Sequence, residues 1–131
     1  MLLPKYTLET FAAAIEKYRI SVTSVVPPIL NAILKSDVEK KFDMRSLRVF
    51  GIGAAPFSDE LAHAVSEKFG GVVSISNGYG LTETSPLVCK MPLEYAKSHP
   101  SWVGKLVCNT VARITDETGR DVRADGELRG E

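Results

Sequence analysis

The residues best suited to chemistry lie in one short run, Asn77–Thr84, which reads NGYGLTET. Its two glycines let the backbone approach a flat or anionic ligand closely, because no Cβ intervenes. The ring of Tyr79 offers a face for stacking, the hydroxyl of Thr82 suits a phosphate oxygen, and the carboxylate of Glu83 is a hard ligand suited to Mg²⁺. The same run also fits a glycine-rich turn whose tyrosine and threonine only pack and cap. Spacing alone leaves both interpretations open.

A second loop of small residues, Gly53–Pro56, follows the apolar run Leu47–Ile52. It begins like a dinucleotide-binding GxGxxG string, but Pro56 stands where the third glycine is needed, and no acidic residue ends the next apolar run. No lysine follows a glycine-rich run, and no serine lies in a GxSxG pattern, so a P-loop and a hydrolase elbow are excluded. His63 and His99 lack a metal-ligand spacing and are expected at the surface.

Short apolar runs and amphipathic helices alternate along the chain and must position these two loops. The sequence predicts helices at 8–19, 28–34 and 59–69 and strands at 22–26, 47–52 and 72–76. Thr7 and Ser58 are suited to cap the first and third helices. The alternation is typical of a parallel sheet flanked by helices, an α/β fold. Ligands of such sheets bind beyond the carboxyl ends of the strands, where both loops are expected.

The end of the chain has a different pattern. Val111–Thr115, a turn at Asp116–Gly119 and a further run at Gly126–Arg129 predict a small antiparallel β piece. The sequence therefore predicts an α/β part at about 1–100 and a β-rich tail at about 101–131. The last residues, Gly126–Glu131, end within a run of strand character, so we expect a fragment of a longer protein.

Composition narrows the class of protein. The 131 residues suffice for one domain, and 44% hydrophobic and 24% charged residues are ordinary for a globular protein. Lys and Arg total 16, as do Asp and Glu, and this balance argues against a nucleic-acid partner. No apolar run approaches the roughly 18 residues of a membrane span. We expect a soluble, intracellular protein.

The two loops together resemble those of the adenylate-forming enzymes, the AMP-dependent synthetase and ligase family. This family includes acyl-CoA synthetases, 4-coumarate–CoA ligases and firefly luciferase. The resemblance is carried by Phe50–Ser58 and Asn77–Thr84, and the YGxTE string in the second segment is the family's most specific motif. Further landmarks are Val26–Leu30 and Val103–Lys105. The resemblance covers essentially the whole chain, is closest to the 4-coumarate–CoA ligase-like branch, and implies that residues 1–131 are the central part of an adenylation (AMP-binding) domain.

The resemblance also implies an ATP site. Ala54, Ala55 and Pro56 would form one wall of an adenine slot, with Tyr79 on the other face. The remaining implied contacts lie in or just after the NGYGLTET run. Asn77 would reach the adenine amino group, and Gly78 and Gly80 would belong to the same nucleotide-binding loop. Gly78, Pro86 and Leu87 would contact the acyl substrate. Thr82 would contact the α-phosphate, Glu83 would hold Mg²⁺, and these two are the implied catalytic residues.

The implied chemistry is the activation of a carboxylic acid by ATP as an acyl-adenylate, followed by transfer to coenzyme A. The family's lysine-bearing phosphate loop, ribose-binding aspartate and C-terminal domain are not among the 131 residues. Three hypotheses therefore stand, of which the first two are part of an ATP-dependent acid–thiol ligase and a catalytically silent, truncated nucleotide-binding fragment or pseudoenzyme. An unrelated α/β binding module is a third. The family places such enzymes in the cytoplasm or in peroxisomes.

Overall fold

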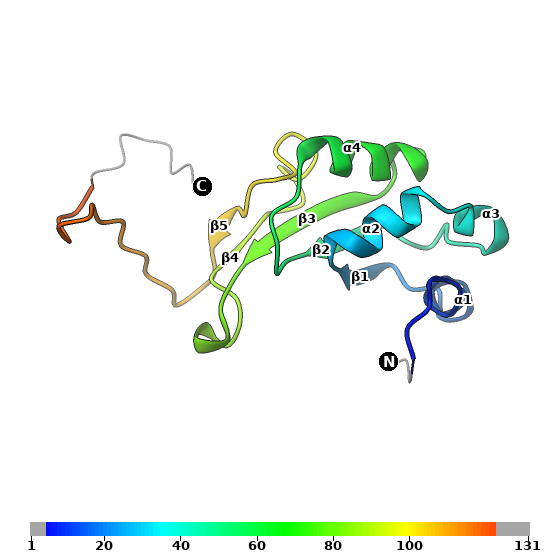
Figure 1. Ribbon diagram of the computed structural model, residues 1–131, viewed down its shortest axis with the longest axis horizontal. Coiled ribbons are helices and arrows are strands. Elements are labelled where there is room, and N and C mark those ends of the chain that lie inside the picture. The colour runs from blue at the N-terminus through cyan, green and yellow to red at the C-terminus, as the bar shows by residue number, and fades with distance from the viewer. Residues whose placement is uncertain (1–4, 123–131) are drawn as a thin grey trace.

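The structure of the protein, a computed structural model, describes residues 5–122 (Figure 1). Helices and strands alternate along the first two-thirds of the chain, as the sequence predicts. In chain order the elements are α1 (Leu8–Tyr18), β1 (Val22–Val25), α2 (Pro27–Leu34), α3 (Val38–Lys41), β2 (Val49–Ile52), α4 (Asp59–Lys68), β3 (Ser74–Tyr79), the 3₁₀ turn η1 (Thr82–Thr84), β4 (Cys89–Lys90) and β5 (Lys105–Leu106). None of the described helices is long and apolar enough to cross a membrane.

The strands form one sheet in the order β1-β2-β3-β4-β5. β1, β2 and β3 are parallel, and the register aligns Val25 with Ile52 and Ile52 with Asn77. β4 runs antiparallel to β3, and β5 runs antiparallel to β4. The predicted parallel sheet with a small antiparallel addition is therefore confirmed. All three parallel strands end on the same side, so the loops that follow β2 and β3 share one edge of the sheet.

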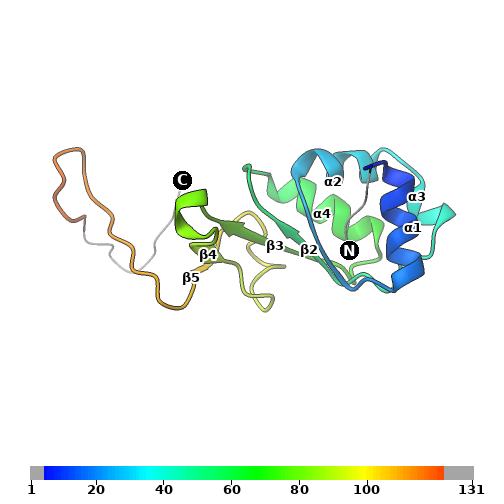
Figure 2. The ribbon, with the colours of Figure 1, turned by 90° about the horizontal axis from the view of Figure 1, so that it is seen from below.

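α2 and α4 lie side by side over one face of the parallel strands, as the ribbon shows from two directions (Figures 1 and 2). The core lies between them and the sheet, and α1 contributes to it. Its fully enclosed large side chains include Ile15, Leu30, Ile33, Phe50 and Val65. Burying a side chain of this kind stabilises the fold by roughly 1.5–3 kcal/mol.

Local signals set the helix ends. The hydroxyl of Thr7 accepts a hydrogen bond from the Thr10 N–H at 3.1 Å, and that of Ser58 accepts one from the Leu61 N–H at 3.3 Å. Both predicted N-caps are thus confirmed. After α4, Gly70 adopts a φ of 66°, a left-handed conformation that ends a helix at little cost only in glycine.

Two elements of the α/β part differ from what the sequence predicts. The short helix α3 was not predicted, because four residues carry too little periodicity to signal one. The third strand is Ser74–Tyr79 instead of 72–76, so Asn77, Gly78 and Tyr79 belong to a strand and not to a loop. Pairing with β2 and β4 extends it, and that pairing overrides the low strand propensity of asparagine and glycine.

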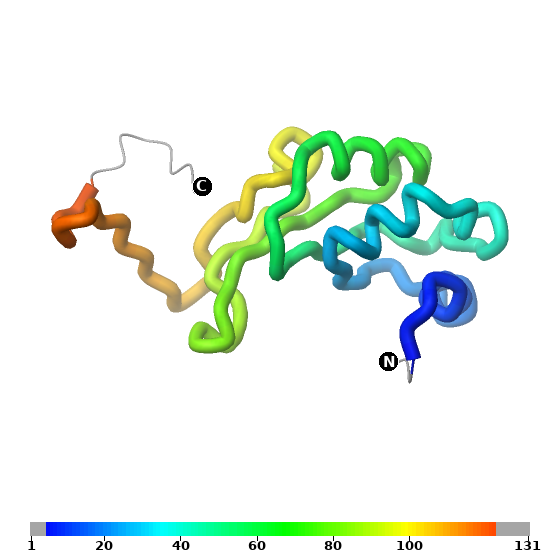
Figure 3. Tube along the Cα trace, viewed as in Figure 1, coloured from blue at the N-terminus to red at the C-terminus, as the bar shows by residue number. Residues whose placement is uncertain are grey.

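The tail also differs from its prediction. The antiparallel strands β4 and β5 lie before the predicted run at 111–115, and Val111–Thr115 forms no strand; it contributes one bridge, Thr115 to Asp121, across the predicted turn. Residues after β5 extend away from the sheet (Figure 3), Val111 is 95% exposed, and within residues 5–122 the 111–115 segment pairs with no strand. The predicted run 126–129 lies outside the described residues. The division into parts at about residue 100 stays a prediction.

Candidate functional site

The two motif segments meet where β2 and β3 end. Ile52 pairs with Asn77, and a Cβ built on Gly53 would lie 3.6 Å from the carbonyl oxygen of Gly78. The first segment therefore leaves the sheet directly beside the second. This adjacency comes from pairing in the parallel sheet, because the two segments are separated in the chain by the whole of α4.

The loop that follows β2 presents small side chains to solvent. Ala54, Ala55 and Pro56 are all exposed. Ala54 has a φ of 72°, a conformation that costs an alanine roughly 1–2 kcal/mol. Such strained backbone gathers at ligand sites, and here it lies at the turn expected to form a wall of the adenine slot.

Asn77 is nearly enclosed, at 6% exposure, and both ends of its amide are engaged. Its Nδ2 donates to the carbonyl oxygen of Ser101 at 2.8 Å, and its Oδ1 accepts from the Gly78 N–H at 2.9 Å. The Ser101 N–H in turn donates to Oδ1 of Asp59, the first residue of α4, at 3.0 Å. We call the bonds from Asp59 through Ser101 to Asn77 the Ser101 brace. The brace ties the start of α4, which follows the 53–56 loop, to the end of β3.

The hydrogen bonds of Asn77 determine which of its atoms could contact an adenine amino group, as the sequence predicts. An amino group donates, so this contact needs an acceptor on Asn77, and Nδ2, which donates to Ser101, cannot serve as one. Only the second lone pair of Oδ1 is left as an acceptor. Sequence reasoning missed Ser101 and the bond from Asp59, since neither residue carries a local signal of such a role.

The structure requires glycine at positions 78 and 80, because backbone of the 86–89 segment leaves too little space for a Cβ. A Cβ on Gly80 would lie 1.7 Å from the carbonyl oxygen of Pro86, and one on Gly78 would lie 3.1 Å from that of Cys89. The segment that carries the predicted acyl-contact residues Pro86 and Leu87 therefore crosses directly over both glycines. Tyr79, between them, is 48% exposed, so much of its side chain is free to contact a ligand.

Thr82 and Glu83 lie on the short turn η1, which is held by its own backbone and by Thr84. The Thr84 hydroxyl donates to the carbonyl oxygen of Leu81 at 2.8 Å, and the Leu81 N–H donates to the same hydroxyl oxygen at 3.0 Å. Both side chains of interest are exposed, and within residues 5–122 Glu83 enters no ion pair. The turn thus presents a hydroxyl and a carboxylate next to each other.

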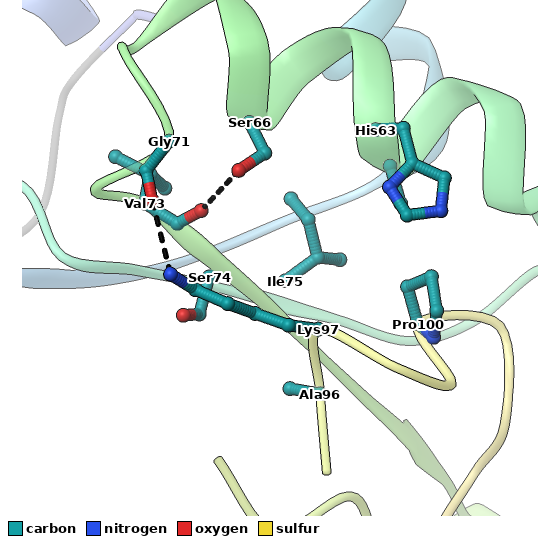
Figure 4. A pocket seen from close by; sticks show the side chains of 10 residues that line it. His63, Ser66, Gly71, Val73, Ser74, Ile75, Ala96, Lys97 and Pro100 are labelled. Carbon is teal, nitrogen blue, oxygen red and sulfur yellow. Dashed lines mark hydrogen bonds between the residues drawn. The ribbon is translucent and has the colours of Figure 1, made fainter. Parts of the chain in front are cut away.

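A cavity elsewhere in the molecule does not include these residues. It lies between α4, the start of β3 and the 96–100 segment, at the opposite end of β3 from the motif (Figure 4). We regard the motif edge as the candidate site, because the predicted residues converge there.

A family model described as "AMP-binding enzyme" matches residues 1–131, the whole chain. The chain belongs to this family. Among curated members, "Probable 4-coumarate–CoA ligase 1" of Dictyostelium discoideum is 37% identical over 123 residues, which cover 93% of this chain and 22% of that protein. "4-coumarate–CoA ligase-like 9" of Arabidopsis thaliana is 39% identical over 117 residues, which cover 88% of this chain and 20% of that protein. The chain spans about a fifth of the length of these relatives.

Solved structures of adenylate-forming enzymes share the fold. The anthranilate CoA ligase AuaEII, in complex with anthranoyl-AMP, superimposes with a TM-score of 0.81 at 22% identity, over 94% of this chain and 23% of that one. The N-terminal domain of FACL13 from Mycobacterium tuberculosis gives a TM-score of 0.77 at 22% identity, over 92% and 30%. The α/β architecture of the AMP-binding family is thus present in this chain.

Proposed function

We propose that the chain forms the nucleotide-binding part of an ATP-dependent acid–thiol ligase, which activates a carboxylic acid as an acyl-adenylate and transfers the acyl group to coenzyme A. Family membership and the names of the 4-coumarate–CoA ligase relatives support this class of reaction. The observation that carries the proposal is the contact between the two motif segments, with Ile52 paired to Asn77 at the sheet edge. We expect such an enzyme inside the cell, in the cytoplasm or in peroxisomes.

The adenine base would lie between the exposed loop Ala54–Pro56 and the ring of Tyr79. Small side chains on one side and an aromatic face on the other suit a flat ring, because stacking needs close approach without polar competition. Asn77 would accept a hydrogen bond from the adenine amino group through Oδ1. The Ser101 brace keeps that amide in one orientation, so little side-chain entropy is lost when the base binds.

The phosphates would lie over η1. The hydroxyl of Thr82 would donate to an α-phosphate oxygen, and the carboxylate of Glu83 would hold Mg²⁺. The residues fit this ion: Glu83 is exposed and unpaired in the described part of the chain, and a single carboxylate is the usual protein share of a site that Mg²⁺ completes with phosphates and water. Residues 5–122 contain no group of three or more His, Cys, Asp or Glu side chains that could hold a metal alone. When bound, Mg²⁺ offsets negative charge on the phosphates.

In the first step, a carboxylate oxygen of the acid attacks the α-phosphorus of ATP, and pyrophosphate leaves with the bonding electrons. In the second, the thiol sulfur of coenzyme A loses its proton to solvent and attacks the acyl carbon, and AMP leaves with the electrons of the bond between the acyl carbon and the phosphate oxygen. The chain's residues would position the acid and the nucleotide. The acyl group would lie against Gly78, with Pro86 and Leu87 beside it. Thr82 would stabilise the charge that develops on the α-phosphate. Positioning and charge stabilisation supply most of the catalysis in phosphoryl-transfer chemistry.

The second candidate is a nucleotide-binding chain that is silent in catalysis. None of the lysines in the 131 residues lies in a glycine-rich phosphate loop. Removing one preorganised charge-stabilising donor commonly costs about 10²–10³ in rate. We therefore expect the 131-residue chain to bind adenine nucleotides weakly and to show no turnover without further donors.

The two candidates are separated by one set of measurements on the purified chain. Binding of ATP with Mg²⁺, and of AMP without it, is measured by calorimetry, and pyrophosphate release and acyl-CoA formation are measured with a panel of carboxylic acids. Glu83→Gln should weaken binding of Mg-ATP by about tenfold, roughly 1.4 kcal/mol, and leave that of AMP almost unchanged. Absence of nucleotide binding would refute the proposal. Turnover that disappears in Glu83→Gln would refute the silent alternative.

A further inference from the structure

A cavity of about 210 Å³ lies between α4, the start of β3 and the 96–100 segment (Figure 4). Its floor is apolar, since Ala62, Val73, Ile75 and Ala96 line it, and its rim is open to solvent at the exposed Lys97 and His63. The cavity is larger than the roughly 150 Å³ of an apolar cavity that holds benzene in another protein. A ring-sized apolar group therefore has enough space here.

One side of the cavity carries a cation without a carboxylate partner. Lys97 extends along the cavity, and its Nζ donates to the carbonyl oxygen of Gly71 at 3.1 Å (Figure 4). That bond uses one of the three donors of the ammonium group. No carboxylate lines the cavity, and Lys97 takes part in no ion pair within the described residues. Two of its donors and its whole charge are available to a ligand.

The other polar groups at the cavity add hydrogen-bonding capacity but less charge. The hydroxyl of Ser66 donates to the carbonyl oxygen of Val73 at 3.0 Å, which leaves its oxygen as an acceptor. His63 is exposed at the opposite end of the cavity from Lys97. The ligand's charge is therefore matched mainly by Lys97.

We propose that this cavity binds a small organic monoanion, a carboxylate with an apolar body about the size of a benzene ring. The apolar body would lie on the apolar floor, and the carboxylate would accept hydrogen bonds from the free donors of Lys97. Inorganic phosphate has no apolar surface to contact the floor of the cavity, and a neutral ring leaves the ammonium group of Lys97 without an anionic partner. The cavity lies away from the proposed phosphate site, because Ser74 and Tyr79 stand at opposite ends of β3, about 16 Å apart.

Benzoate is the probe, titrated into the isotope-labelled 131-residue chain while backbone amide signals are followed by NMR. Saturable shifts are expected at Ala62, Val73 and Ala96. Benzamide, which has the ring without the charge, and inorganic phosphate, which has charge without the ring, should each bind at least about tenfold more weakly. Lys97→Met should weaken benzoate binding by about tenfold, and Lys97→Arg should retain it, since a charge-assisted hydrogen bond contributes about this much.

Lys97 is exposed, so neither variant is expected to unfold the chain. Absence of saturable shifts at the cavity, equal binding of phosphate, or full binding by Lys97→Met would each overturn the proposal. Benzoate shifts confined to Gly78–Leu87 would also overturn it, since they would show binding at the acyl positions of the proposed ligase site. Nucleotide binding plays no part in this readout, so the outcome does not depend on the proposed function.

Discussion

Replacing Gly80 with alanine would force apart two backbone segments of the candidate site, the one at Gly80 and the one at Pro86 and Leu87. The added Cβ would lie 1.7 Å from the carbonyl oxygen of Pro86, 2.7 Å from its carbonyl carbon and 2.9 Å from the Cα of Leu87. Contacts of a Cβ shorter than 3.0 Å are essentially never seen, and all three atoms belong to the backbone. The segments must therefore separate, because no flexible side chain can move aside.

The cost follows from what the separation disrupts. Overpacking of this kind typically destabilises a protein by about 1–3 kcal/mol. The same movement strains the hydrogen bond from the Val88 N–H to the carbonyl oxygen of Tyr79, which is 2.8 Å long, and the net loss of such a bond adds about 1 kcal/mol. We expect Gly80→Ala to lower the free energy of unfolding by about 2–4 kcal/mol. For a domain of this size, the melting temperature should fall by roughly 10 °C.

Gly53→Ala is the matched control, because its Cβ would make an ordinary contact, 3.6 Å from the carbonyl oxygen of Gly78. Both variants are compared with the unmodified chain by thermal and urea unfolding, followed by circular dichroism, and by calorimetric titration with AMP. Gly80→Ala should lose stability and nucleotide affinity together, whereas Gly53→Ala should lose less than about 1 kcal/mol of stability. Equal stability of the two variants would refute the close approach of Gly80 to the 86–87 segment.

Three further predictions concern polar contacts. Asp59→Ala should remove the bond from the Ser101 N–H and speed hydrogen exchange of the Ser101 amide about fivefold, as expected when a hydrogen bond worth about 1 kcal/mol is lost. Asp59→Asn keeps an acceptor oxygen and should keep the protection. Faster exchange in both variants would contradict the brace. Lys68→Met should destabilise the chain by about 3 kcal/mol in urea unfolding, because it leaves the largely buried Glu39 carboxylate without its partner, 3.1 Å away; a change below about 1 kcal/mol would show that the pair is solvated. The Arg45 guanidinium and backbone N–H hold the pKa of Asp43 well below its ordinary value. Because this pKa is lower in the folded state, the ionised carboxylate stabilises the fold at pH values above the unfolded-state pKa near 3.9, and this contribution is lost as the pH falls below that value. The free energy of unfolding, measured from about pH 5 to pH 2, should therefore decline less steeply in Asp43→Asn than in the unmodified chain.

The elements that sequence patterns predicted well are those set by local chemistry. The stripe Phe11, Ala12 and Ile15 repeats at helical spacing, and all three side chains are buried in α1. Phe50 and Ile52 alternate toward the core in β2. The start of η1 and the end of β3 were less predictable, because Asn77–Tyr79 has turn-like composition and becomes strand only through its two neighbours.

By itself, the sequence determined the order of helices and strands, the caps at Thr7 and Ser58, and the motif residues that indicate the AMP-binding family. Each of these depends on residues a few positions apart, whose periodicity or chemistry acts within one element. Tertiary structure alone decided which groups meet at the candidate site. Ser101 accepts from Asn77, 24 residues away, and donates to Asp59, 42 residues away. Such bonds leave no mark on the local pattern, because they form only after packing of α4 and β3 has brought distant backbone within reach.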